Sequence, residues 1–331
     1  MSAEQFNLVA DIGGTNARFA LHHQQRSEFV HPRTYFCAEY ARLEDALAEY
    51  LRDSGARVKQ AAIAIATPVS GDFVQMTNHH WRFSIQQAQR ELRLQRLTVL
   101  NDFTALALSL PHLSAGELVQ VGGASAEPQA AIGVIGPGTG LGVSGLLWSG
   151  ERWLPLSSEG GHVMYAPQRE REWQMAQLLA RRYGNFPSFE RIVSGPGLCA
   201  VYESLCELDG VAPLAHTPAE VAQRASENVD ARFHEVFEIF CAALGNAAGN
   251  LALTLGARGG IYIGGGIVPR WGEQFLRSGF RQSFENKGRL SAYLASIPCF
   301  VVHAKLPALI GAATVFDPLA APAVEALDGS C

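Results

Sequence analysis

Short apolar runs that lead into glycine-rich turns are the main hydrophobic pattern of this chain. Residues 6–22 contain two such runs around a turn at Gly13–Asn16, which predicts two strands joined by that turn. Residues 130–148 repeat the arrangement around a turn at 136–140, again with a threonine in the turn. The sequence therefore predicts a strand–turn–strand unit that occurs twice.

Longer stretches with apolar residues at helical spacing separate these strands. They predict helices over residues 40–54, 84–92, 103–110, 169–183, 197–208, 217–227 and 230–255. A third apolar run at 260–263 leads into the glycines at 264–266, and a strand beginning at Leu97 ends in Asn101 and Asp102. Strands that alternate with helices predict an α/β protein.

Two stretches without charged residues are long enough to resemble membrane spans. Residues 130–150 contain Pro137 and seven glycines, which favours a hairpin over a helix. Residues 239–257 hold two asparagines and continue an amphipathic helix that starts near Asp230. We therefore interpret the second stretch as a buried helix of a soluble protein.

The composition narrows the class of protein. The chain has 331 residues, enough for two domains, and 26 Lys and Arg against 31 Asp and Glu give a net charge of −5. This balance argues against nucleic acid or an anionic membrane as a partner. None of the three lysines follows a glycine, which excludes a Walker P-loop.

The cysteines and the N-terminal residues predict the cell compartment of the protein. The six cysteines are scattered without a Cys-x-x-Cys pair, a pattern typical of reduced thiols in a cytoplasmic protein. No basic segment followed by an apolar run precedes Asp11, so we expect no signal peptide. The prolines and glycines of residues 109–128 predict the crossing between domains, and the tail after Asp317 is expected to be loosely held.

Both glycine turns have the composition of phosphate-binding turns. Backbone N–H groups hold phosphate best in turns that only glycine can adopt, backed by a hydroxyl group. Asp11–Asn16 and Gly138–Gly140 both fit, and Asp11 at a strand end could address a metal–phosphate complex. A single turn of this kind is more often a plain hairpin. Two matched turns together favour a site that grips a triphosphate.

Two further segments carry polar groups suited to a small ligand. Asn101 and Asp102 follow a strand, where ligand-binding residues of α/β sheets gather, although Asp102 could simply cap the next helix. Glu159 and His162 flank two glycines that would leave the backbone open to a polar ligand. A single histidine in such a segment is more often structural.

Together, these motifs resemble those of bacterial glucokinases, in the same order and over nearly the whole chain. The matching segments are D-I-G-G-T-N-A-R at 11–18, A-T-P-V-x-G-D at 66–72, M-T-N-H-x-W at 76–81, L-N-D-F-T-A at 100–105, G-P-G-T-G-L-G at 136–142, E-G-G-H at 159–162, E-R-I-V-S-G-P-G-L at 190–198 and I-G-G-G-I at 263–267. The resemblance implies an α/β, two-domain actin-like ATPase fold of duplicated RNase-H-like topology around a central cleft. It also implies a small domain of residues 1–111 and 304–331 and a large domain of residues 112–303.

The resemblance assigns a role to each matching residue. The hydroxyls of glucose would be held by Asn101, Asp102, Glu159, His162 and Glu190. Asp102 would also be the general base. Phosphates and, through water, Mg²⁺ at Asp11 would be held by Asp11, Ile12, Gly13, Gly14, Thr15, Asn16, Gly138, Thr139 and Gly140. The adenosine would lie against Gly264 and Gly265.

The implied activity is ATP-dependent phosphorylation of the 6-hydroxyl of D-glucose, the first step of glycolysis, in the cytoplasm. Two alternatives stay open: a kinase for another hexose or an amino sugar, and an ATPase switch of the actin or heat-shock type. A homodimer is also left open. A related family of sugar kinases and repressors has a zinc-binding cysteine cluster beside its histidine. The resemblance implies ATP and Mg²⁺ as cofactors, and because no cysteine lies between Cys37 and Cys199, we expect no zinc.

Overall fold

The computed structural model describes residues 6–26, 28–227 and 230–316, which form two compact units. The first unit comprises the described residues within Met1–Leu113, Ser149–Pro155 and Lys305–Cys331. The second comprises those within Ser114–Trp148 and Leu156–Ala304. The chain thus first changes unit inside the segment 109–128. The tail from Asp317 onward lies outside the described residues.

A mixed sheet forms the centre of the first unit, in the order β3–β2–β1–β4–β7. Its strands are β1 (Phe6–Ile12), β2 (Asn16–His23), β3 (Phe29–Phe36), β4 (Gln60–Ile65) and β7 (Arg96–Asn101). β2 runs antiparallel to β1 and β3, whereas β1, β4 and β7 run parallel. Nearly every side chain of β1 is buried, as in a central strand covered on both faces.

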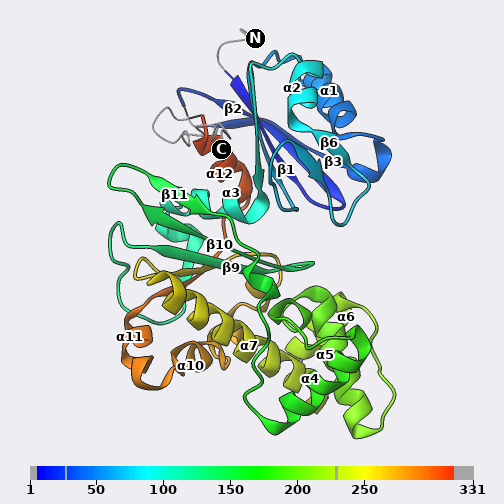
Figure 1. Cartoon of the computed structure of the whole chain (residues 1–331), viewed down its shortest axis with the longest axis vertical. Coiled ribbons are helices and arrows are strands. Elements are labelled where there is room, and N and C mark those ends of the chain that lie inside the picture. The colour runs from blue at the N-terminus through cyan, green and yellow to red at the C-terminus, as the bar shows by residue number, and fades with distance from the viewer. Residues whose placement is uncertain (1–5, 27, 228–229, 317–331) are drawn as a thin grey trace, which may run out of the picture. The chain divides into compact units, whose positions relative to one another are not determined.

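Four helices and a hairpin accompany this sheet. They are α1 (Leu43–Ser54), α2 (Ile85–Glu91), α3 (Asp102–Ser109), α12 (Pro307–Thr314) and the strands β5 (Phe73–Gln75) and β6 (Arg82–Ser84). α12 lies beside α3 (Figure 1). Gly311 of α12 makes this approach close, because a Cβ atom there would lie 1.6 Å from the carbonyl oxygen of Ala105 in α3. Only glycine fits at this crossing.

The sheet of the second unit repeats the topology of the first. Its strands are β8 (Leu118–Gln120), β9 (Ile132–Pro137), β10 (Leu141–Trp148), β12 (Ile261–Ile263) and β13 (Cys299–Val302), while β11 (Trp153–Leu156) follows β10 along the chain. In the order β10–β9–β12–β13, the first pair is antiparallel and the next two are parallel. The series β2–β1–β4–β7 pairs in the same way. The predicted duplication of the strand–turn–strand unit is therefore confirmed.

Helices make up most of the rest of the second unit. They are α4 (Glu170–Tyr183), α5 (Gly195–Asp209), α6 (Pro218–Glu227), α7 (Ala231–Leu255), α8 (Val268–Trp271), α9 (Glu273–Leu276), α10 (Phe280–Glu285) and α11 (Ser291–Ser296). α4, α5 and α6 gather around one end of α7 (Figure 1). The seven helices expected from the hydrophobic pattern are all present, with ends within three residues of the expected ones.

Among the described residues, α7 is the one helix long and apolar enough to cross a membrane. In its most apolar window, 72% of the residues are buried inside the molecule, as expected for a core helix. Its small residues serve packing, because a Cβ atom on Gly245 would lie 2.1 Å from the carbonyl oxygen of Phe280. The interpretation of this stretch as a buried helix agrees with the structure.

Candidate functional site

The first glycine turn joins β1 to β2 and is held by backbone hydrogen bonds. The N–H of Gly13 donates to the carbonyl of Asn16 (2.9 Å), and the N–H of Cys37 donates to the carbonyl of Thr15 (2.9 Å). Neither Gly13 nor Gly14 has the left-handed φ that favours glycine, so the expected conformational reason is wrong here. Gly14 instead makes room: a Cβ atom would lie 3.3 Å from Asn78.

The two residues before this turn have different environments. The side chain of Ile12 is fully buried in the core, and its carbonyl accepts the N–H of Ala66 (2.9 Å). Asp11 faces Arg18 across the β1–β2 hairpin, and the guanidinium donates to its carboxylate at 3.1 Å. Burial raises the pKa of the Asp11 carboxyl above its ordinary value, and Arg18 opposes that rise. Arg18 is a site residue that the sequence reasoning left without a role, although hairpin pairing places it opposite Asp11.

Asn101 and Asp102 mark the point where β7 ends and α3 begins. The Oδ1 atom of Asn101 accepts the N–H groups of Phe103 (3.0 Å) and Thr104 (3.2 Å), so Asn101 is the N-cap of α3. Asp102 is the first residue of the helix, with its Oδ1 atom 2.9 Å from the N–H of Phe103. The alternative that Asp102 is the cap is therefore wrong. The partial positive charge at the start of α3 favours the ionised form of a carboxyl placed there.

A buried threonine connects Asn101 to the segments 66–72 and 76–81. The Nδ2 group of Asn101 donates to the carbonyl of Thr67 (3.2 Å). The hydroxyl of Thr67 in turn donates to the carbonyl of Gln75 (2.9 Å) and lies 3.2 Å from the hydroxyl of Thr77. These contacts fix the orientation of the Asn101 amide. The two motifs thus have a local structural role that the sequence reasoning did not assign.

Strand register places the first phosphate turn and Asp102 at the same edge of the sheet. Ile12 at the end of β1 pairs with Ile65 of β4, and Ile65 pairs with Asn101 of β7. Strands lie 4.7–4.9 Å apart, so about 10 Å separates the end of β1 from that of β7. A phosphate held on the turn and a sugar hydroxyl at Asp102 could therefore meet at this edge.

The second glycine turn, in the second unit, is shorter than expected because β9 continues through Pro137. The N–H of Gly138 donates to the carbonyl of Gly140 (2.8 Å). The carbonyl of Gly138 accepts the N–H of Gly195 at the start of α5 (2.8 Å). Neither glycine of the turn has a left-handed φ. Gly140 instead leaves room for the Glu190 carboxyl group, since a Cβ atom at residue 140 would lie 2.6 Å from Oε2 of Glu190 and that side chain would have to shift.

Gly264 and Gly265 lie directly against the end of β9. The N–H of Gly264 donates to the carbonyl of Ile135 (2.9 Å). Gly265 has φ 80°, and a Cβ atom on it would lie 2.3 Å from the carbonyl oxygen of Pro137. Both conformation and space therefore require glycine at 265. The structure brings this glycine pair next to the second phosphate turn.

The E-G-G-H segment packs on β10 through its glycines. A Cβ atom on Gly161 would lie 1.9 Å from the carbonyl oxygen of Leu141, and one on Gly160 would lie 2.8 Å from Val143. The expectation that these glycines leave the backbone open to a ligand is therefore wrong, because they allow close packing. Glu159 and His162, in contrast, have exposed side chains.

Glu190 stands between the E-G-G-H segment and the second phosphate turn. Its Oε1 atom lies 4.0 Å from Nδ1 of His162. Its Oε2 atom accepts the N–H of Leu141 at 3.0 Å. The backbone carbonyl of Glu190 accepts the hydroxyl of Ser194, the N-cap of α5. Three of the predicted segments thus converge on one carboxyl group.

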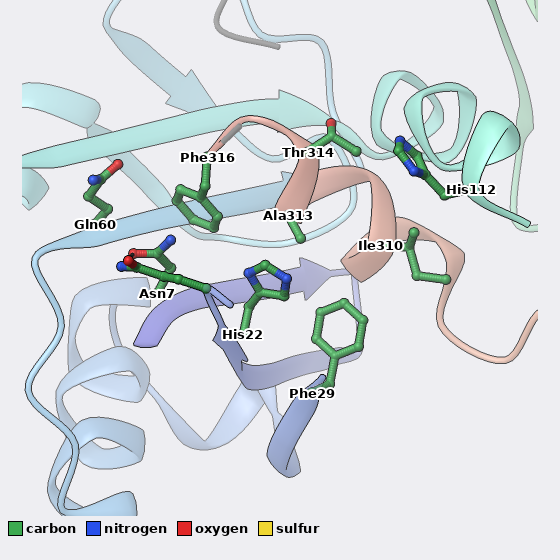
Figure 2. Close-up of a pocket in the computed structure, with 10 residues that line it drawn as sticks. Asn7, His22, Phe29, Gln60, His112, Ile310, Ala313, Thr314 and Phe316 are labelled. Atoms are coloured by element: carbon green, nitrogen blue, oxygen red, sulfur yellow. Dashed lines mark hydrogen bonds between the residues drawn. The ribbon is translucent and has the colours of Figure 1, made fainter. Parts of the chain in front are cut away.

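A hollow of about 780 Å³ in the first unit contains none of the predicted residues. Figure 2 shows Asn7, His22 and Gln60, which come from the strands, together with Thr314 and Phe316, which come from the C-terminal end of α12 and the residues after it. Asn7 and Gln60 stand near the amino ends of β1 and β4, so this hollow lies at the edge of the sheet opposite the phosphate turn. It is therefore separate from the candidate active site.

The two mixed sheets and their duplicated strand–turn–strand topology define an actin-like ATPase fold of the sugar-kinase type. A family model described as Glucokinase matches residues 8–318. A glucokinase from Chromobacterium violaceum is 52% identical over 307 residues, covering 92% of this chain and 88% of that protein. The chain belongs to the glucokinase family. The predicted family, fold and enzyme class are thus confirmed.

Two solved structures agree with this assignment. The crystal structure of glucokinase from an Antarctic psychrotroph has a TM-score of 0.82 at 34% identity, covering 93% of this chain and 98% of that one. A ROK family glucokinase from Streptomyces griseus, solved in complex with glucose and AMPPNP, has a TM-score of 0.64 at 18% identity and covers 93% of this chain and 98% of that one. The second likeness concerns the fold alone.

Proposed function

We propose that this enzyme transfers the γ-phosphoryl group of ATP to the 6-hydroxyl of D-glucose, with Asp102 as the general base. The observation that carries this proposal is the strand register that puts the Gly13–Thr15 turn and Asp102 at one sheet edge. Asp102 would accept the proton of the 6-hydroxyl as that oxygen attacks the γ-phosphorus and the bond to the β-phosphate oxygen breaks. The products are glucose 6-phosphate and ADP.

We propose a role for each polar residue and glycine turn of the matching motifs. The hydroxyl groups of glucose would be bound by Asn101, Asp102, Glu159, His162 and Glu190. Carboxylate oxygens suit this task because each carboxylate accepts several directed hydrogen bonds. The phosphates would lie on the N–H groups of the two glycine turns, and the adenosine against Gly264 and Gly265. The proposed small domain comprises residues 1–111 and 304–331 and the proposed large domain residues 112–303, whereas the first compact unit also includes Ser149–Pro155.

The donor set at Asp11 fits Mg²⁺ held through water. Mg²⁺ keeps several waters and is bound by one or two carboxylates together with substrate phosphates. Asp11 supplies one carboxylate beside the first phosphate turn. Burial disfavours the charged form of this carboxyl, and a cation beside it would restore that form. When bound, Mg²⁺ would neutralise charge on the phosphates.

The proposed substrates, glucose and ATP, suggest the cell compartment and the metabolic step. We propose a cytoplasmic enzyme at the first step of glycolysis, where glucose and ATP meet.

A coupled ADP-release assay over a panel of hexoses and amino sugars tests which sugar is the substrate. D-glucose should give the highest kcat/KM, and a higher value for an amino sugar would contradict the proposal.

The Glu159 carboxylate should act on sugar binding alone. We expect Glu159→Gln to raise the KM for glucose about tenfold or more, because a lost charged hydrogen bond costs about 1–3 kcal/mol. The KM for ATP should stay within about twofold of the wild-type value, since no phosphate contact is removed. Steady-state kinetics with each substrate varied in turn checks this. Equal rises in both KM values would contradict a sugar-specific role.

The cysteines are poor candidates for a zinc site. Burial raises the pKa of the Cys199 thiol to about 11 and that of the Cys299 thiol to about 12, whereas zinc is bound by thiolates. We therefore expect purified protein to contain no stoichiometric zinc and to keep full activity after treatment with a zinc-selective chelator. Elemental analysis showing one zinc per chain would overturn this expectation.

A further inference from the structure

The Glu190 carboxyl group makes two kinds of contact with its two oxygens. Oε2 accepts the N–H of Leu141, the residue that directly follows the phosphate turn (3.0 Å). The same oxygen occupies the space that a side chain at position 140 would need. Oε1 faces Nδ1 of His162 at 4.0 Å. Oε2 thus supports the Gly138–Gly140 turn, and Oε1 faces the E-G-G-H segment.

The backbone of Leu141 lies against both Glu190 and the E-G-G-H segment. Its N–H is held by Glu190, and its carbonyl oxygen lies where a Cβ atom of Gly161 would otherwise be. Its antiparallel partner in β9 is Pro137. Glu190 therefore braces the hairpin at the point where the turn enters β10.

The backbone of Glu190 is itself fixed on both sides. The N–H of Phe189 donates to the carbonyl of Val163 (2.9 Å), directly after the E-G-G-H segment. The hydroxyl of Ser194 donates to the carbonyl of Glu190 (2.7 Å), and Gly195 donates to Gly138 in the turn. These hydrogen bonds fix the backbone around Glu190. The backbone therefore cannot shift to compensate for a change in the Glu190 side chain.

We propose that Glu190 is a positioning residue for the nucleotide, in addition to its proposed role as a sugar ligand. By accepting the Leu141 N–H, it holds the Gly138–Gly140 turn in the shape that receives phosphate. This inference rests on the proposed function, because it requires that the turn binds the nucleotide. A residue that only bound sugar would not change nucleotide binding in the absence of sugar.

A comparison of two neutral variants isolates the hydrogen bond from the charge. Glu190→Gln keeps an acceptor oxygen for Leu141, whereas Glu190→Ala removes it, and both remove the negative charge. AMPPNP affinity is measured by calorimetry, first without sugar and then with glucose at a saturating concentration for each variant. We expect Glu190→Gln to bind AMPPNP at least about tenfold more tightly than Glu190→Ala in both conditions, because Ala loses one partly buried hydrogen bond that orders the turn.

The matched control is the same pair of substitutions at Glu159, an exposed carboxyl that makes no contact with Leu141 or Gly140. Glu159→Gln and Glu159→Ala should bind AMPPNP equally without sugar. Thermal unfolding confirms that each variant is folded. If Glu190→Ala does not fold, Glu190→Ser replaces it, because serine is also neutral and its side chain is too short to reach Leu141.

The outcomes separate this inference from the function on which it rests. Equal AMPPNP affinities for the Gln and the shortened variant at 190 would overturn the positioning role. The proposed sugar site would still stand in that case if the KM for glucose rises in the Glu159 and Glu190 variants. A wild-type protein that binds AMPPNP in neither condition would overturn both.

Discussion

We expect Asp102→Asn to lower kcat by at least about 10²-fold while the protein stays folded and binds ATP normally. The amide cannot accept the proton of the attacking hydroxyl, and general base catalysis contributes about 10²–10⁴-fold. The fold should survive because the side chain that caps α3 is that of Asn101. Single-turnover kinetics with glucose, together with thermal unfolding and calorimetry with AMPPNP, measures the three quantities.

Asn101→Ala is the matched control for this experiment. Removal of an N-cap costs about 0.5–2 kcal/mol, so this variant should lose stability where Asp102→Asn does not. The loss of stability is therefore expected at position 101, which caps α3 and is also a proposed glucose contact, and the loss of general base catalysis at position 102. A folded Asp102→Asn protein with near-normal turnover would contradict the assignment of the base.

The second large effect is expected at the crossing of α3 and α12. Gly311→Ala should lower the free energy of unfolding by roughly 3 kcal/mol, because the new methyl group would overlap the carbonyl of Ala105. The overlapping atoms belong to the backbone of α3, so a side-chain rotation cannot relieve the clash. The gain in helix propensity from alanine, about 1 kcal/mol, is smaller. Since α3 begins at Asp102, kcat should fall as well.

Urea denaturation of Gly311→Ala is compared with that of Gly116→Ala. Gly116 has no atom within 4 Å of an added Cβ and no left-handed φ, so its substitution should change stability by no more than about 0.5 kcal/mol. Equal urea midpoints for the two variants would show that α3 and α12 can move apart without a loss of stability. The helix contact would then not determine the position of Asp102.

Much of the fold could be predicted because its signals are local. Amphipathic spacing located α4 and α7 to within a residue or two, and the structure shows that both helices end at glycines with left-handed φ, Gly184 and Gly256. Glycine turns between apolar runs located the two hairpins. The local signals indicated an α/β protein, and the family motifs added the actin-like ATPase fold within that class.

Other strands were missed for physical reasons. β3 is largely exposed and contains Pro32, so it lacks the alternating pattern of a half-buried strand. β4 is rich in alanine, a residue depleted in strands, and is defined by its burial between β1 and β7. β8 and β13 are short and depend on partners far along the chain. Such pairings are tertiary features that a local pattern cannot specify.

The candidate site shows the same division. Sequence motifs named Asn101, Gly140 and Glu190, but not what each contacts. That Asn101 caps α3, and that Gly140 is small because Glu190 lies against it, depend on residues brought together by folding. The conformational reason for the turn glycines was wrong because Gly14 and Gly140 have no left-handed φ; each instead leaves room for a neighbour, Asn78 or the Glu190 carboxyl group.

The most direct measurement is a crystal structure with D-glucose, Mg²⁺ and AMPPNP. The 6-hydroxyl of glucose should lie about 2.6–3.2 Å from the Asp102 carboxylate, the reach of a general base. The other hydroxyls should contact Glu159, His162 and Glu190, and the phosphates should lie on the N–H groups of both glycine turns. Glucose bound elsewhere, or bound with Asp102 away from its 6-hydroxyl, would contradict the account.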